Sequence, residues 1–72
     1  MEPIKIESKQ TLSREDAAAW LSGLADQLAA GGEVELNRQG VQFEFGVPDE
    51  VELEVELEIE DGKTELEIEL HW

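Results

Sequence analysis

The sequence has no cysteine, one histidine and only five basic residues against 19 acidic ones. Without cysteine, the chain forms no disulfide and has no thiolate for a metal or redox site. A formal net charge of -14 leaves no basic surface, which argues against nucleic acid or an anionic membrane as a partner. No run approaches the ~20 apolar residues that a membrane helix needs, and residues 1–5 do not start a signal peptide. These absences predict a cytoplasmic protein that binds neither nucleic acid nor membrane.

Groups that could carry catalysis or hold a cofactor are equally scarce. His71 is the sole histidine, and the glutamates occupy equivalent positions in which none is set apart as an acid or a base. The pair Gly31-Gly32 lies where a helix ends, whereas a phosphate-binding loop opens one. We therefore expect no enzyme, no catalytic residue, no cofactor and no specific metal site.

What the sequence does contain is alternation of apolar residues and glutamate over residues 51–72, around Asp61-Gly62. Alternation with period two is typical of a strand with one buried face, and Asp-Gly is a favoured two-residue hairpin loop. With that loop, Leu57 faces Leu66 on the apolar side, while glutamates face one another on the wet side. In the same register His71 faces Glu52, which we interpret as a cross-strand ion pair.

A helix is predicted at residues 14–30. Ser13 is a suitable N-cap, and the acidic residues that follow favour the positive end of the helix. Apolar residues then recur at helical spacing until Gly31-Gly32, where glycine can end the helix in a left-handed conformation.

The remaining segments complete a sheet. Residues 33–36 and 41–47 read as strands joined by an even-length turn that sets Leu36 opposite Val41, and a loop at residues 48–50 sets Val47 opposite Val51. Residues 3–8 add a further strand, which we place antiparallel beside the C-terminal strand rather than parallel beside residues 33–36. The prediction is one domain over residues 1–72, of the α+β class. Its mostly antiparallel five-stranded sheet has the order β-α-β-β-β-β, with the helix on one face.

Several stretches of the chain also match a known pattern. They are Ser-Arg-Glu-Asp at residues 13–16, an alanine-rich helix with Trp20-Leu21, the Gly31-Gly32 stop, Val47-Pro48, and an amphipathic strand at residues 66–72 that ends in Trp72. Together they resemble the amphi-Trp domain family over nearly the whole chain. The resemblance implies a small acidic domain of salt-loving and other prokaryotes, and it brings no activity, substrate or catalytic residue with it.

The glutamate face indicates the solvent that the protein meets. Like charges about 5 Å apart across a sheet repel by under ~1 kcal/mol in water, and the Debye length shrinks from about 10 Å at 0.1 M salt to about 3 Å at 1 M. We interpret the face as halophilic adaptation. Two alternatives stay open: an acidic, nucleic-acid-mimicking surface for a basic protein, and weak binding of divalent cations by carboxylates.

The width of the predicted sheet, compared with that of the helix, leads to a functional hypothesis. Five strands span over ~20 Å, whereas one helix covers about 10 Å, so an apolar strip stays exposed, as at protein interfaces. We predict a small, salt-adapted interaction module that self-associates through this strip as a homodimer, with an acidic adaptor as the alternative and cation binding third. The candidate interface residues are Trp72, Leu70, Ile4 and Ile6.

Overall fold

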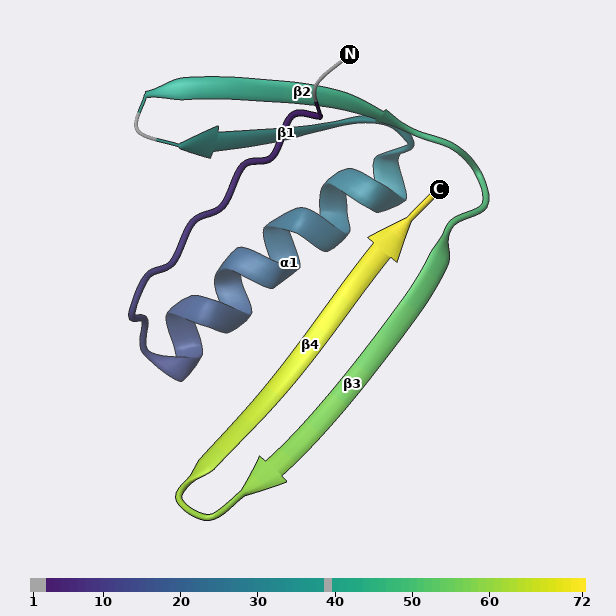
Figure 1. Cartoon of the computed structure of the whole chain (residues 1–72). Helices are drawn as coiled ribbons and strands as arrows, with labels where there is room; N and C mark the ends of the chain where they lie inside the picture. Colours follow the sequence, from purple (N-terminus) through teal and green to yellow (C-terminus); the bar gives the residue numbers. More distant parts are fainter. Residues whose placement is uncertain (1–2, 39) are drawn as a thin grey trace.

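The computed structural model describes residues 3–38 and 40–72, and it has the predicted α+β class (Figure 1). One helix, α1 (Arg14–Ala30), precedes four strands in these residues. The strands are β1 (Gly32–Arg38), β2 (Val41–Val47), β3 (Glu52–Glu60) and β4 (Lys63–His71). They form two separate antiparallel sheets, β1 with β2 and β3 with β4.

Both ends of α1 lie where the sequence predicts them. Ser13 Oγ accepts a hydrogen bond from the Asp16 amide at 3.0 Å, which satisfies one of the first-turn donors. Gly31 follows the last helical residue with a φ of 83°, and its amide donates to the Leu28 carbonyl at 3.3 Å. Glycine takes this positive φ without the steric cost that a β-carbon would add.

The β3–β4 hairpin has the predicted register. Its pairs run from Glu52 opposite His71 to Glu60 opposite Lys63, and they include Leu57 opposite Leu66. The loop is Asp61-Gly62, with Gly62 at a φ of 75°. The predicted register is therefore confirmed. It keeps the apolar side chains together, because a slip by one residue would move every one of them to the glutamate side.

The predicted register of β1 with β2 is wrong by two residues. Val34 lies opposite Phe45 and Leu36 opposite Phe43, so the prediction of Leu36 opposite Val41 fails. Pairing continues to Arg38 opposite Val41, where Gly40 has a φ of 80°, so the loop is shorter than predicted. A shift of two keeps the same side chains on the same face, and the sequence alternation therefore did not exclude it.

The single five-stranded sheet is also wrong. Within the described residues β2 pairs with β1 alone, so Val47 and Val51 do not pair. Alternation fixes which side chains share a face of a strand, but it does not fix which strand lies beside it, so the sequence did not exclude a β2–β3 pair. Residues 3–13 form no strand. Two apolar side chains, Ile4 and Ile6, are too few to offset the ordering of that short segment.

The core lies between α1 and the β1–β2 sheet. Val34, 1% exposed, is the one fully buried side chain among the described residues. The half-buried side chains around it are Leu24, Gln27, Leu28, Leu36, Phe43 and Val47. The Gln27 side-chain amide fastens the helix to β1, because it donates to the Glu35 carbonyl at 3.2 Å and accepts from the Glu35 amide at 2.7 Å. In the part of the chain that is described, no helix is long and apolar enough to cross a membrane.

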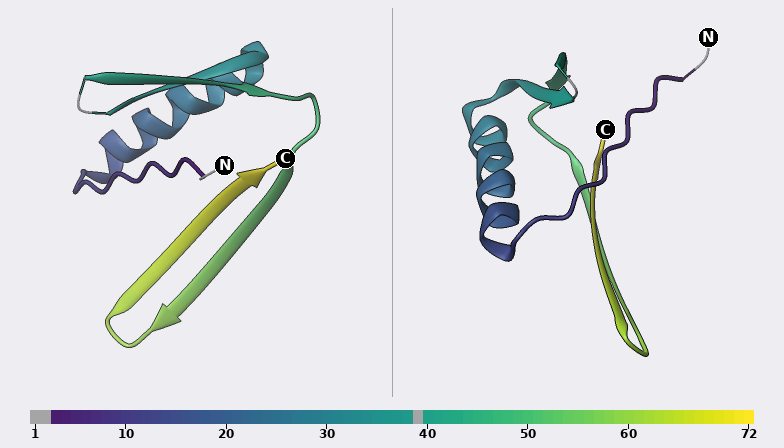
Figure 2. Two further views of the ribbon diagram at one scale, coloured as in Figure 1. Left: turned by 45° about the horizontal axis from the view of Figure 1, so that its top comes forward. Right: turned by 90° about the vertical axis from the view of Figure 1, so that its left-hand side faces the viewer.

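The β3–β4 hairpin extends away from this core (Figure 2). In each view its Asp61-Gly62 end projects beyond the start of α1. The radius of gyration is 14.2 Å, whereas a compact chain of this length has about 11 Å. The accessible surface is 6868 Å² for a mass of 8.1 kDa, against about 4,500 Å² for a compact monomer of that mass. The open shape therefore exposes roughly 2,400 Å² beyond the usual area.

Candidate interaction surface

The two sides of the β3–β4 hairpin differ completely in chemistry. Because side chains alternate along a strand, the antiparallel register gathers the apolar side chains on one side and the glutamates on the other. We name the first side the hairpin apolar face. It comprises Val51, Leu53, Val55, Leu57, Ile59, Leu66, Ile68, Leu70 and Trp72.

Exposure of this face increases from the base of the hairpin to its loop. Along β3 and the residue before it, the exposed fraction is 39% at Val51, 61% at Leu57 and 72% at Ile59. On β4, Leu66 is 62% exposed and Leu70 is half-buried. The outer part of the face is therefore the least covered large apolar surface of the hairpin.

An aromatic contact holds the base of the hairpin against the other sheet. The ring of Trp72 stacks on that of Phe45 in β2, with centroids 6.1 Å apart and an interplanar angle of 23°. This geometry is within the range of favourable offset stacking. Together with the short connection at residues 48–51, the stack fixes the base of the hairpin while its loop end extends away from α1.

The four predicted interface residues belong to two separate segments of the chain. Leu70 and Trp72 lie at the base of the hairpin apolar face, and Trp72 remains 57% exposed. Ile4 and Ile6, 88% and 45% exposed, belong to the extended segment before α1 and are not paired with β4. Sequence reasoning overlooked the outer residues of the face as the most exposed ones. The signal was present, since the alternation continues to the loop although the chain has one short helix to cover it.

A smaller apolar area lies at the start of α1. Leu12, Trp20 and Leu21 are 42%, 50% and 50% exposed, and they line a shallow hollow of about 420 Å³ beside Lys9. This area is distant in sequence from the hairpin. Its two leucines have exposed fractions somewhat below those of Leu57 and Leu66 in the hairpin apolar face.

On the glutamate side of the hairpin, carboxylates face carboxylates directly. The opposed pairs are Glu54 with Glu69, Glu56 with Glu67 and Glu58 with Glu65. Lys63 relieves part of this charge: it is opposite Glu60 in the register, as predicted, but its ammonium lies 3.0 Å from the carboxylate of Glu65. All these side chains are exposed, so each such contact adds little to stability.

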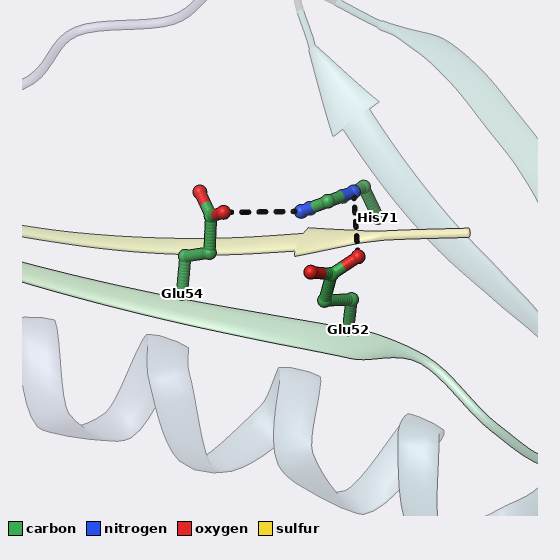
Figure 3. Close-up of side chains that lie close together, drawn as sticks. All are labelled: Glu52, Glu54 and His71. Atoms are coloured by element: carbon green, nitrogen blue, oxygen red, sulfur yellow. Dashed lines mark ion pairs between the residues drawn. The ribbon is translucent and has the colours of Figure 1, made fainter.

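His71 lies between two glutamates of β3 (Figure 3). Its Nδ1 is 3.7 Å from Glu52 Oε2, which is the predicted cross-strand partner, and its Nε2 is 3.8 Å from Glu54 Oε1. One ligand atom from each of the three lies within 4.8 Å of the others, and all three residues are exposed. The side chains project from the side of the hairpin opposite α1, so the hairpin apolar face is on the side of the helix. Imidazole together with carboxylates is a donor set for divalent transition metals. In this solvated position, the same three side chains also form an ordinary cluster of surface contacts.

Comparison with known proteins identifies a family. The model of the family described as the Amphi-Trp domain matches residues 1–72, which is the whole chain. No curated protein and no solved structure matches the sequence significantly.

Proposed function

We propose that this chain, which belongs to the Amphi-Trp domain family, is a small, salt-adapted interaction module that docks on other proteins through the hairpin apolar face. The observation that carries this proposal is the exposure of 57% to 72% of Val55, Leu57, Ile59, Leu66 and Ile68 on one side of one hairpin. Monomeric proteins rarely leave so large a contiguous apolar surface in water unless it binds something.

The glutamate side supports the same proposal. With a net charge of -14, molecules repel one another at low ionic strength and stay dispersed despite the apolar face. Concentrated salt screens that repulsion within a few ångströms and strengthens apolar association. The module therefore docks best in a salt-rich cytoplasm, where its charge no longer opposes the approach of a partner.

The test compares two glutamine variants of neighbouring cross-strand pairs. Leu57→Gln with Leu66→Gln alters the hairpin apolar face, and Glu56→Gln with Glu67→Gln alters the opposite side. Dilute wild-type protein in molar salt is expected to bind a dye that fluoresces on apolar surfaces. The leucine variant should lose most of that signal and the glutamate variant should keep it. If the wild type binds no dye, and its Leu57 and Leu66 methyl groups are shielded from a soluble paramagnetic probe in the dilute monomer, the proposal fails.

An acidic adaptor for a basic protein is the second candidate. It is favoured by the glutamate side, where Lys63 and His71 lie among eight exposed carboxylates. These are Glu52, Glu54, Glu56, Glu58, Glu60, Glu65, Glu67 and Glu69. Salt separates the two candidates, because binding of a basic protein to this side weakens as salt rises, whereas apolar docking strengthens. The cluster of Glu52, Glu54 and His71 is where the third candidate, weak cation binding, would act.

A further inference from the structure

We infer that the partner of the hairpin apolar face is a second copy of this chain, whose own hairpin packs on it face to face about a two-fold axis. The inference depends on the proposed function, because it names the occupant of the same surface. It is carried by three features of the molecule: the excess exposed area, the segregation of charge, and the projection of the hairpin from the body.

The area fits a pair of chains. Each molecule exposes roughly 2,400 Å² more than a compact monomer of its mass, with an accessible surface of 6868 Å². Specific interfaces bury about 1,200–2,000 Å² in total, and those of obligate homodimers bury about 2,000 Å² or more. The outer residues Val55, Leu57, Ile59, Leu66 and Ile68 are 57% to 72% exposed. Brought together from two chains, they bury an area on the order of the ~1,200 Å² at which specific interfaces begin.

The segregation of charge allows another copy to be the partner. Within the hairpin, every apolar residue of the face lies on one side and the glutamates lie on the other. Face-to-face packing sets two such sheets about 10 Å apart and turns both glutamate sides outward into water. The carboxylate rows are then farther apart than the Debye length of about 10 Å at 0.1 M salt. The arrangement buries no charge, and the same patch serves both chains, as a two-fold interface requires.

The position of the hairpin makes this contact accessible. Its loop end projects beyond the start of α1, so a second hairpin can reach the outer part of the face without meeting the helix (Figure 2). The base is held by the stack of Trp72 on Phe45. Pairing with a second hairpin at the outer part of the face leaves that stack in place.

The first experiment measures the dimer by sedimentation in molar salt. Leu57→Gln with Leu66→Gln is expected to raise the dimer dissociation constant on the order of 100-fold or more, since two leucines leave the interface from each copy. The matched control is Leu12→Gln with Leu21→Gln, which replaces exposed leucines outside the hairpin. The control should leave the dissociation constant unchanged. If the control weakens the dimer instead, the hairpin packs on the partner's helix area and the face-to-face arrangement is wrong.

The second experiment uses the absence of cysteine from the sequence. A spin label on Glu58→Cys, on the glutamate side, leaves the hairpin apolar face intact. It tests whether two hairpins pack face to face, even if Leu57→Gln with Leu66→Gln does not fold. Labels on the outer sides of two sheets packed about 10 Å apart should lie on the order of 20–30 Å from each other. Labels on Asp26→Cys of α1 should lie farther apart.

The outcomes separate the two claims. A strict monomer at every salt concentration that still binds the apolar dye overturns the second copy as partner and leaves the proposed function intact. A strict monomer that binds no dye overturns both. A dimer whose Glu58 labels lie farther apart than its Asp26 labels also overturns the face-to-face arrangement.

Discussion

Gln27 shows how one side chain can attach a helix to a strand. Its amide group pairs with both backbone groups of Glu35, in the way that a neighbouring strand would. The half-buried Gln27 and the buried Val34 line the same small hollow. Within residues 3–38 and 40–72, α1 packs on β1 and makes no side-chain hydrogen bond to the hairpin, so Gln27 has a large share in holding the helix to the strands.

Replacing Gln27 with alanine should loosen this attachment. A hydrogen bond contributes about 0.5–1.5 kcal/mol net, and the Glu35 groups can partly rehydrate, so we expect a loss of about 1 kcal/mol in the free energy of unfolding. Amide exchange of Glu35 should accelerate in the same variant. Ser22→Ala, an exposed position of the same helix, should change neither quantity. Unchanged exchange at Glu35 in Gln27→Ala would show that the amide pairing is not formed in solution.

At the scale of the element, the hairpin is held by its apolar pairs against its own charge. Leu57 opposite Leu66 and Val55 opposite Ile68 favour the ladder, whereas the flanking glutamate pairs oppose it. The apolar side gains little from burial within one chain, since most of its side chains are more than half exposed. The hairpin of a single molecule in dilute salt is therefore the element most sensitive to ionic strength.

Neutralising one opposed carboxylate pair tests that balance. Glu56→Gln with Glu67→Gln removes a direct repulsion, so at low salt and low protein concentration it should raise the free energy of unfolding by up to about 1 kcal/mol. The gain should shrink in 1 M salt, where the Debye length is about 3 Å. Glu33→Gln is the control, because Glu33 is opposite Gly46 and has no facing carboxylate. Denaturant unfolding followed by circular dichroism measures all three proteins, and an equal gain in the control would contradict the explanation.

The elements also show what the sequence could predict and why. The helix bounds and the β3–β4 register follow from local chemistry, since Ser13 and Gly31 mark the helix ends and the two-residue loop Asp61-Gly62 fixes the register. The β1–β2 register was wrong because a slip of two residues keeps the apolar pattern, and the length of the turn decides it. The sheet as a whole was wrong because strand order depends on contacts between distant segments, for which alternation carries no information. For the same reason the sequence predicted a strand at residues 3–8, which contain Ile4 and Ile6, where the structure has none.

At the scale of the molecule, the proposed pairing couples association to folding. Within the described residues Val34 alone is fully buried, so a single chain gains little from a hydrophobic core, and domains of this size are marginal even when compact. Pairing two hairpin apolar faces would supply the missing burial. With the proposed pairing, the protein would draw part of its stability from its concentration and from the salt around it.

This coupling gives a prediction for unfolding. Because association stabilises the folded state by mass action, the denaturant midpoint of the wild type should rise with protein concentration, and it should rise more steeply in 1 M salt than in 0.1 M. Leu57→Gln with Leu66→Gln should unfold at a midpoint that is independent of concentration, because its face no longer pairs. Glu56→Gln with Glu67→Gln should keep the concentration dependence but lose part of the salt dependence, since fewer carboxylates need screening. Midpoints from a hundredfold range of protein concentration, in both salts, measure each of these slopes. A wild-type midpoint that does not move with concentration in molar salt would mean that each chain completes its fold alone.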